Sequence, residues 1–480
     1  MLLRLYIRII FSEVKAQFNE LLIEQIPIIL YCCTISLRDF ISGGFVPSKH
    51  IVVIGAGIAG LTAAFRLQQA GHSVQVLESD AKVGGRMITI HWQGLAIDPG
   101  AEFVTGADKL LLDLTRQLNF EDKLIHYSEQ QTGFNVSVMR GGTVHTVNFM
   151  SIPSYLGWTG VSLGARLSML KLLPHMLRAG RVNVYTPEEG PGDDSITMEK
   201  FFYEKINGEM FEYWCQPTMD VFCGYTVDDL SARMLLMLFG SYLNQKLYTF
   251  EGGIGFFPET LASKLAVTLN ATARRIDLLS DGSGATVYYV VDGRPEKVDC
   301  EAVVLAVPGD AVLELFESPP ASWQAFFRKV RFTRVGIVYH LLEGDDPALD
   351  EGGIMFPRQE PWQLSALGWK RRPDGRVLAM SDLKAHLYDP TLSDDGLKKV
   401  ITEEVERAVP QFAGKIKDQM VFRWRRKVPA YPPGLLTALK TFKQNPHEGP
   451  VYFCGDYLAG PNTGAALASG WFCAEKITSP

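Results

Sequence analysis

The stretch HIVVIGAGIAG, residues 50–60, decides the fold of this chain. Its first half is a short run of apolar, mostly β-branched residues, which is typical of a buried strand in a parallel sheet. Three glycines follow: Gly55 permits a tight turn, Gly57 lets a phosphate approach the backbone, and Gly60 lets a helix pack closely on the strand. The pattern predicts a strand, a turn and a helix whose N-terminus binds an anionic phosphate. The other residues predicted to contact this ligand are Ala56, Ile58 and Ala59.

A second strand and an acidic residue follow the predicted helix. The segment SVQVLES, residues 73–79, is predicted to form that strand and contains Glu78 near its end. A carboxylate at this place accepts hydrogen bonds from both hydroxyls of an adenosine ribose, and it repels a 2′-phosphate. Strand, helix and acid in this order predict a Rossmann-like domain that binds an adenine dinucleotide.

The next two segments relate the chain to a known family. AKVGGRMITI, residues 81–90, and IDPGAEFV, residues 97–104, resemble consecutive motifs of the flavin amine oxidase superfamily, which includes monoamine and polyamine oxidases, protoporphyrinogen oxidase and phytoene desaturases. The resemblance implies FAD as the cofactor, with Gly85 and Arg86 at its pyrophosphate. The second segment is similar to the one that runs beside the isoalloxazine ring, which implies contacts from Gly100, Ala101, Glu102 and Phe103.

Two later segments resemble the same family in the same order. They are YTFEGGIGFFPETLASKL, residues 248–265, and VYFCGDYLAGPNTGAALASGWFCAEKI, residues 451–477. The resemblance implies an adenine contact, an acid at the ribityl or pyrophosphate part, and a helix N-terminus whose dipole stabilises the anionic reduced flavin. The residues at these places are Ala273, Gly455, Asp456, Thr463, Gly464 and Ala465. The cysteine that links FAD in some relatives lies at a different place from Cys454, so non-covalent FAD is expected.

The order of these segments predicts the organisation of the chain. The expected fold class is α/β, with a Rossmann-like, GR2-type FAD-binding domain interleaved with a discontinuous α+β substrate-binding domain. The FAD-binding domain is expected at residues 49–125, 248–315 and 440–480, the substrate-binding domain at 126–247 and 316–439, and an N-terminal extension at 1–48. Residues 284–307 predict a β-hairpin, and residues 151–182 predict a helix-rich lobe.

The cofactor does not decide the substrate, because enzymes of this superfamily oxidise different molecules. Amine oxidases of the family carry a lysine on a strand under the flavin and an aromatic cage around the substrate amine. Here VRFTRVGIVYHLLEG, residues 330–344, places Val335 near the lysine position, and Pro461 falls at a cage position. By contrast, QPTMDVFCGYTVDDLSARMLLMLF, residues 216–239, and FRWRRKVPAYPPG, residues 422–434, resemble segments of protoporphyrinogen oxidases.

We therefore expect an FAD-dependent oxidoreductase that removes a hydride from C–H bonds of a bulky apolar substrate, similar to protoporphyrinogen oxidase, with O₂ or another molecule as electron acceptor. Two alternatives stay open: a flavin amine oxidase with replaced lysine and cage, and a flavin-binding protein without turnover. No residue is assigned a catalytic role, and His340 is interpreted as a strand-end side chain rather than a base. Cations for the propionates of a porphyrinogen could come from Arg334, Arg423, Arg425 or Arg426.

Composition limits the other functions. The formal net charge is −6 and no basic stripe is visible, so nucleic acid is not an expected partner. The nine histidines include no HxxxH or HxH pair, so no metal site is expected. Seven scattered cysteines without a CxxC pair indicate reduced thiols and a cytoplasmic location.

Membrane contact and oligomeric state are less constrained. The apolar runs within residues 1–48 are interrupted by charges and are shorter than the roughly 20 residues that cross a bilayer. A peripheral contact with a membrane surface is left open for these residues and for residues 151–182. A homodimer is left open as well.

Overall fold

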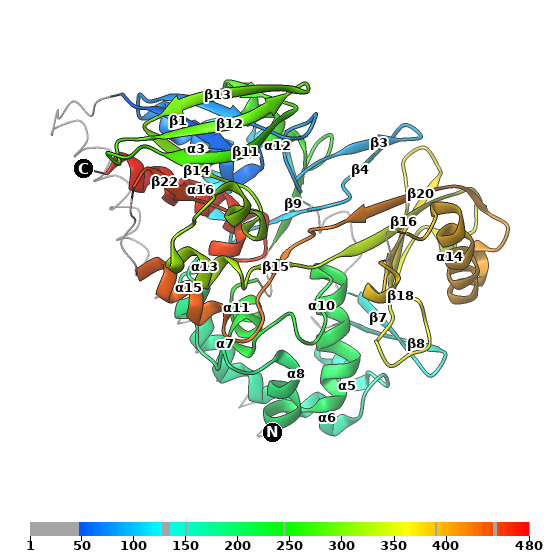
Figure 1. Cartoon of the computed structure of the whole chain (residues 1–480). Helices are drawn as coiled ribbons and strands as arrows, with labels where there is room; N and C mark the ends of the chain where they lie inside the picture. Colours follow the sequence, from blue (N-terminus) through cyan, green and yellow to red (C-terminus); the bar gives the residue numbers. More distant parts are fainter. Residues whose placement is uncertain are drawn as a thin grey trace. The chain divides into compact units, whose positions relative to one another are not determined.

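The stretch at residues 50–60 contributes the central strand of a parallel sheet (Figure 1). The structure is a computed structural model, and it describes residues 48–126, 135–148, 151–242, 246–388, 391–444 and 449–479. Strand β1 (His50–Ile54) lies between β2 (Ser73–Leu77) and β14 (Ala302–Leu305), while β10 (Val267–Thr268) and β22 (Val451–Phe453) form the edges. All four pairings are parallel, so the carboxyl ends of the strands share one edge of the sheet.

Both faces of this sheet are covered, which explains the continuous apolar run of β1. Helices α3 (Ile58–Gln69) and α16 (Thr463–Thr478) pack on the face that carries Ile51 and Val53. The two helices approach so closely that a Cβ atom on Gly470 would lie 2.0 Å from the carbonyl oxygen of Ala59. The opposite face packs against an antiparallel sheet of β11 (Ala271–Leu278), β12 (Ala285–Val291) and β13 (Arg294–Cys300).

The predicted hairpin at residues 284–307 is confirmed for β12 and β13, which pair antiparallel across a turn at Asp292 and Gly293. The last part of that segment, β14, joins the parallel sheet beside β1 instead. The physical reason is the composition of Ala302–Leu305, which is apolar at every position and is buried throughout. Such a run is stable only in a strand that is covered on both faces.

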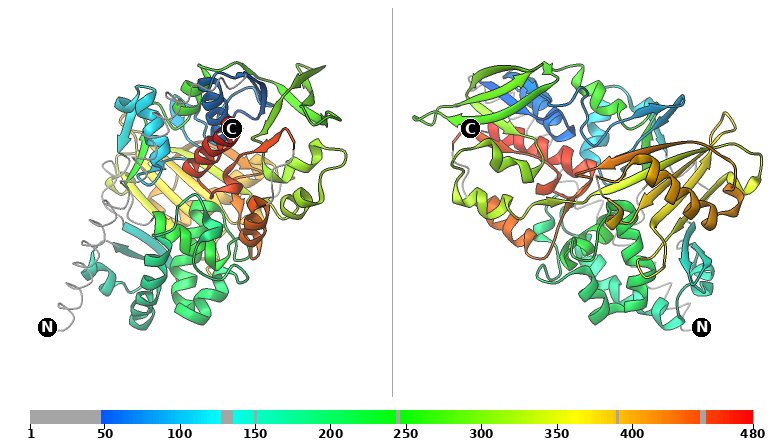
Figure 2. Two further views of the ribbon diagram at one scale, coloured as in Figure 1. Left: turned by 90° about the vertical axis from the view of Figure 1, so that its left-hand side faces the viewer. Right: turned by 45° about the vertical axis from the view of Figure 1, so that its right-hand side comes forward.

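A second sheet has seven strands, which come from other segments of the chain than the parallel sheet. Its strands pair mainly antiparallel. Its order is β20 (Ile416–Trp424), β16 (Val335–Leu342), β19 (Val377–Leu383), β18 (Leu364–Arg371), β17 (Glu351–Met355), β7 (Asn135–Arg140) and β8 (Thr143–Asn148). Helix α14 (Asp394–Ala408) packs on the face that carries Val338 and Leu342 (Figure 2). The other face carries Ile337 and Tyr339 and packs against the hairpin of β3 (Ile90–Trp92) and β4 (Leu95–Ile97).

Helices dominate residues 151–242. They are α5 (Ile152–Gly157), α6 (Leu163–Ser168), α7 (Leu173–Ala179), α8 (Met198–Phe201), α9 (Gly208–Met210), α10 (Gln216–Cys223) and α11 (Ala232–Tyr242). The predicted helix-rich lobe at residues 151–182 is confirmed by the first three. In the part of the chain that the structure describes, no helix is both long and apolar enough to cross a bilayer.

The predicted α/β fold is confirmed, because a parallel sheet with the expected strand–turn–helix start is combined with a second, mixed sheet. The domain boundaries stay a prediction, and the extension at residues 1–48 lies almost wholly outside the described residues. The other elements are α4 (Lys109–Gln117), α12 (Phe256–Ala262), α13 (Ala321–Phe327), α15 (Leu435–Gln444), β5 (Val104–Thr105), β6 (Leu124–His126), β9 (Leu247–Phe250), β15 (Arg331–Phe332) and β21 (Pro429–Ala430).

Candidate active site

The glycine turn after β1 has the shape that a phosphate requires. Gly55 has a φ of 106°, and a Cβ atom on it would lie 2.6 Å from the carbonyl oxygen of Ala306. A Cβ atom on Gly60 would lie 2.0 Å from the oxygen of Gly55, whereas one on Gly57 would meet no atom within 4 Å. No side chain caps the N-terminus of α3 at Gly57. Open space beside uncapped amides at a helix N-terminus fits an anionic phosphate.

The predicted glycine–arginine segment lies directly against this turn. The N–H of Gly84 donates to the carbonyl oxygen of Ala56 at 2.8 Å. Gly85 has a φ of 59°, and a Cβ atom on it would lie 3.4 Å from Gly57 Cα. The structure therefore brings together two glycine segments that the sequence separates, and places Arg86 next to the turn.

Arg86 holds the C-terminal flavin motif in place. Its guanidinium donates two hydrogen bonds to the Asp456 carboxylate, Nη1 to Oδ2 at 2.7 Å and Nη2 to Oδ1 at 2.9 Å. Nη1 also donates to the carbonyl oxygen of Lys427 at 3.1 Å. A bidentate pair of this kind fixes orientation as well as charge. Two predicted cofactor residues from opposite ends of the chain thus form one unit.

Glu78 is buried beside the same turn. Its Oε2 accepts the N–H of Ala56 at 2.6 Å, and its Oε1 accepts the N–H of Asp80 at 2.9 Å. Oε1 also accepts the hydroxyl of Ser79 at 3.1 Å, so the acceptor capacity that remains for a ribose hydroxyl lies on Oε2. The N–H of Ala271 donates to the Glu78 carbonyl at 2.7 Å, which aligns the start of β11, and with it Ala273, beside the acid.

The C-terminal helix starts at Thr463 as predicted, and the residue before it, Asn462, caps its N-terminus. The side-chain oxygen of Asn462 accepts the N–H of Ala465 at 2.8 Å. This N–H is therefore bonded to the cap, and the flavin contacts of Thr463, Gly464 and Ala465 stay a prediction. Gly464 abuts Asp108, to whose Oδ1 a Cβ atom would approach within 1.8 Å. An asparagine directly before a predicted helix is a capping signal, and the sequence reasoning missed it.

Residues 100–103 are held by contacts with the Arg86 segment and with helix α10. The N–H of Ala101 donates to the carbonyl oxygen of Arg86 at 3.0 Å, and Gly100 leaves room for this approach, because a Cβ atom there would lie 2.1 Å from the same oxygen. The ring of Phe103 meets that of Phe222 in α10 edge-on, with 6.2 Å between the centroids. Burial raises the pKa of Glu102 to about 7.

The sequence reasoning missed a group of polar residues near this segment. They are Asp220 in α10, Tyr339 in β16, Asp382 in β19 and Lys427 before β21. Tyr339 and Asp382 are each only 3% exposed. Within the described residues, Tyr339 Oη and Asp382 Oδ1 have no hydrogen-bond partner. One sequence signal could have indicated that Asp382 is buried: side chains alternate along a strand, so Asp382 lies on the same face as Leu378 and Met380. An acid in a strand is, however, ordinarily expected on the face that contacts solvent.

The position predicted for an amine-oxidase lysine is apolar. Val335 is buried at the start of β16, and Gly224 packs so closely that a Cβ atom on it would lie 2.5 Å from Val335 Cγ2. Pro461, at the predicted cage position, is buried as well. The structure therefore offers no cationic or aromatic side chain at these two places.

The histidine and two of the four arginines considered as a base or as cations are already bonded to other side chains of the protein. His340 lies fully buried within β16, its Nε2 is 2.7 Å from Ser381 Oγ, and burial lowers its pKa to about 3. Arg423 pairs with Asp394, and Arg426 pairs with Asp310 at 2.8 Å. The two remaining arginines predicted as propionate contacts, Arg334 and Arg425, are exposed.

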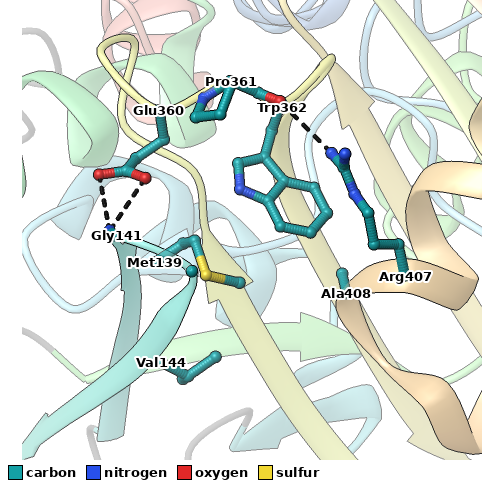
Figure 3. A pocket seen from close by; sticks show the side chains of 9 residues that line it. Met139, Gly141, Val144, Glu360, Pro361, Trp362, Arg407 and Ala408 are labelled. Atoms are coloured by element: carbon teal, nitrogen blue, oxygen red, sulfur yellow. Dashed lines mark hydrogen bonds between the residues drawn. The ribbon is translucent and has the colours of Figure 1, made fainter.

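A surface pocket of about 410 Å³ opens elsewhere, between the β7–β8 hairpin and the end of α14 (Figure 3). Its charged side chains already have partners. Glu360 accepts the N–H of Gly141 at 3.1 Å, and the guanidinium of Arg407 lies 3.8 Å from the centre of the Trp362 ring (Figure 3). We therefore place the candidate active site at the glycine turn and its surroundings rather than in this pocket.

Cysteines and metal-ligand residues add no second centre. Among the described residues, no three His, Cys, Asp or Glu side chains come together in a way that could hold a metal ion. The cysteines that the structure describes are all buried and free: Cys215, Cys223, Cys300, Cys454 and Cys473.

Comparison with known proteins relates the chain to a family. The sequence model of the family described as flavin containing amine oxidoreductase matches residues 58–478. Protoporphyrinogen oxidase 2, chloroplastic/mitochondrial, of Arabidopsis thaliana is 21% identical over 90% of this chain and 94% of its own length. Coproporphyrinogen III oxidase of Bacillus subtilis is 22% identical over 82% of this chain and 90% of its own.

A solved structure shares the fold. Wild-type putrescine oxidase bound to putrescine superimposes with a TM-score of 0.71 at 19% identity, over 90% of this chain and 100% of that chain. The open phosphate turn fits the adenine dinucleotide part of a flavin cofactor, and the family match extends over most of the chain. The chain therefore belongs to the flavin-containing amine oxidoreductases, and it is an oxidoreductase whose cofactor is FAD.

Proposed function

We propose that the protein removes a hydride from a C–H bond of a bulky, largely apolar small molecule, in the manner expected for a protoporphyrinogen oxidase-like enzyme. The observation that carries this proposal is the mainly apolar face of the seven-stranded sheet, which packs in part against the β3–β4 hairpin. It begins with Val335 at the position where the resemblance places the lysine of an amine oxidase. The indole N–H of Trp424 donates to the carbonyl oxygen of Pro99 at 2.7 Å and attaches this face to residues 97–104. The face comprises Val335, Ile337, Tyr339, Met380, Phe422 and Trp424.

We assign the holding of FAD to the residues around the glycine turn. Gly57 and the α3 N-terminus would bind the pyrophosphate, Glu78 the adenosine ribose, and Arg86 with Asp456 the region between them and the flavin ring. Residues 100–103 would run beside the ring, and FAD would supply the hydride acceptor. Binding is proposed to be non-covalent, because a hydrogen bond with Cys473 and burial raise the pKa of the Cys454 thiol well above its usual value, and a protonated thiol is a poor nucleophile.

The experiment that tests this proposal is anaerobic reduction of the purified, FAD-loaded protein. A porphyrinogen, benzylamine and a polyene are mixed with it separately, and loss of the oxidised flavin absorbance is followed. We expect the porphyrinogen to reduce the flavin. Reduction by benzylamine alone would favour the amine oxidase alternative. The buried carboxyl groups of Glu102, Asp220 and Asp382 support that alternative, because they could bind an amine. Failure of all three would favour a flavin-binding protein without turnover.

A peripheral membrane contact is a second proposal, supported by helices α5 to α7. Five leucines there, of which Leu156 lies in α5, are between 40% and 65% exposed, and basic side chains lie among them. Exposed apolar groups with interspersed cations suit an anionic bilayer surface. Co-sedimentation with vesicles of anionic phospholipid tests it: wild type should sediment, and the double variant L167D/L170D should not. The other residues are Leu163, Arg166, Leu167, Leu170, Lys171 and Leu177.

A further inference from the structure

Two buried polar side chains on the apolar face of the seven-stranded sheet have unsatisfied oxygen atoms. Asp382 in β19 pairs in register with Ile337 of β16, so it shares a face with Tyr339 two residues further along that strand. Both side chains are 3% exposed. Neither Asp382 Oδ1 nor Tyr339 Oη has a hydrogen-bond partner within the described ranges. A buried, unpaired carboxylate oxygen costs free energy unless a donor reaches it.

Three other segments contribute charged groups at the same place. Glu102 belongs to the segment that carries Phe103, whose ring packs on α10, and Asp220 lies in that helix. The ammonium group of Lys427 lies 3.5 Å from the carbonyl oxygen of Val221, one residue beyond Asp220. The backbone of Lys427 donates to the carbonyl oxygen of Thr333, immediately before β16. Four segments far apart in the sequence therefore bring these groups close enough for their charges to interact.

The charges in this carboxylate pocket, defined as Glu102, Asp220 and Asp382, are unbalanced. Three carboxyl groups share Lys427 as the cation that acts on all of them. Burial, together with the neighbouring Asp382, raises the pKa values of Glu102 and Asp220 to about 7. Other groups also face these carboxyl groups: Asp98 and Arg372 act on Glu102, and Lys384 and the side chain of Gln216 act on Asp220. Tyr339 interacts with Glu102 and Asp382.

We propose that the carboxylate pocket binds an N–H group of the substrate and takes up its proton, the nitrogen being bonded to the carbon that is oxidised or conjugated with it through a ring. The shared chemistry is an N–H donor, which an alkylammonium group or a pyrrole-type N–H can supply. This inference rests on the proposed function, because the proton has to leave only if the neighbouring carbon loses a hydride.

The proposed step is balanced in atoms and electrons. The N–H bond breaks and its proton moves to a pocket carboxylate. The C–H bond would break with both electrons, and bound FAD would supply the oxidant that accepts this hydride. The electron pair left on nitrogen forms a new double bond to carbon, directly in an amine or through the conjugated ring in a pyrrole. An alkylammonium group first gives up one more proton to solvent, which frees its lone pair.

Anaerobic calorimetry on the FAD-loaded protein tests the binding part. The probes are benzylammonium, benzyl alcohol and benzoate, which share one ring and differ in charge and donors. We expect benzylammonium to bind and benzoate not to bind. Titrations at pH 7 in two buffers of different ionisation enthalpy should show proton release on benzylammonium binding, because a bound cation favours the ionised form of the carboxyl groups that titrate near this pH.

Variants connect the effect to the pocket. Asp382→Asn should weaken benzylammonium binding by about tenfold or more and leave benzyl alcohol binding unchanged, since it removes charge but keeps shape. Glu102→Gln is the second variant, should Asp382→Asn not fold. Asp374→Asn, in the exposed β18–β19 turn, is the matched control, because Asp374 pairs with Arg376 at 2.6 Å outside the pocket.

Porphyrinogen reduction distinguishes the two sources of the N–H group. If the substrate is a pyrrole, Asp382→Asn should slow flavin reduction by porphyrinogen and shift its pH profile, with FAD affinity unchanged. Equal binding of benzylammonium and benzoate, or full binding by both variants, would overturn the carboxylate pocket. Selective benzylammonium binding without flavin reduction by any amine or porphyrinogen would instead overturn the proposed function and leave the pocket standing.

Discussion

Asp456 and Asp382 are both buried carboxylates, and their surroundings are opposite. Asp456 is 5% exposed and receives two guanidinium hydrogen bonds from Arg86. Asp382 is 3% exposed, and its Oδ1 has no partner in the described part of the chain. Burying a charge is tolerated where the fold supplies the counter-charge, and is costly where it does not. The carboxylate of Asp456 therefore has its counter-charge within the folded chain. We infer that the carboxyl group of Asp382 receives its hydrogen-bond donor from a ligand.

The two regions also differ in how the backbone positions them. The Arg86–Asp456 pair lies at the carboxyl edge of a parallel sheet, where loops that follow different strands necessarily meet. Asp382 lies on the face of a mostly antiparallel sheet, where its direction is set by the pairing register with β16. Loss of a residue should therefore disturb the first region through folding and the second through ligand binding.

The largest effect is expected from Arg86→Met. The change leaves Asp456 buried without its counter-charge, so the free energy of unfolding should fall by about 2–4 kcal/mol, and FAD should be lost during purification. Urea denaturation and the flavin absorbance of the purified protein measure the two effects. Arg425→Met, at an exposed arginine, is the control. A stable, yellow Arg86→Met protein would contradict the role given to the pair.

Glu78→Ala is expected to weaken FAD binding by about 1.5–3 kcal/mol, because it removes charge-assisted hydrogen bonds to the ribose and to the turn amide of Ala56. Equilibrium titration of the apoprotein with FAD measures the change. Glu78→Gln keeps one acceptor oxygen, so its affinity for FAD should lie between those of Glu78→Ala and wild type. Asp281→Ala, in an exposed turn, should leave affinity unaltered. Unchanged affinity in Glu78→Ala would remove the adenosine end of the proposed site.

His340 lies on the opposite face of β16 from Tyr339 and Asp382 and is a buried polar residue whose ring nitrogens have partners, Ser381 and Gln419. Burial lowers its pKa from 6.5 to about 3, so the unfolded chain takes up the proton first as pH falls. Stability from this residue is present above pH 6.5 and is lost as pH falls toward 3, by about 2 kcal/mol over the first two pH units. Denaturation of wild type and His340→Gln along a pH series should show a shallower acid slope in the variant. Parallel slopes would mean that another group governs the acid response.

The smallest effect is expected from deleting residues 1–48. Strand β1 begins at His50 and pairs with both β2 and β14, so the parallel sheet is complete without the deleted segment. FAD content and melting temperature should stay within error of the full chain. A deletion protein that folds but has lost its flavin would show that the segment contributes to the first region.

The sequence by itself determined the start of the FAD-binding fold. Residues 50–60 and Glu78 fixed a strand, a turn, a helix and an acid, because backbone freedom at glycine and the apolar run of a buried strand are local properties of consecutive residues. Family resemblance added Arg86 and Asp456 as separate contacts. Their mutual pairing was not visible, since it joins residues 370 positions apart.

Only the tertiary structure decided the carboxylate pocket and the state of the C-terminal helix. Glu102, Asp220 and Asp382 lie on three distant segments, and strand register and helix packing decide whether their side chains meet. The cap at the start of that helix, in which the Asn462 side chain accepts the N–H of Ala465, became visible only in the structure. Sequence patterns specify which groups a segment carries, whereas the direction of each group depends on contacts that form only when the whole chain has folded.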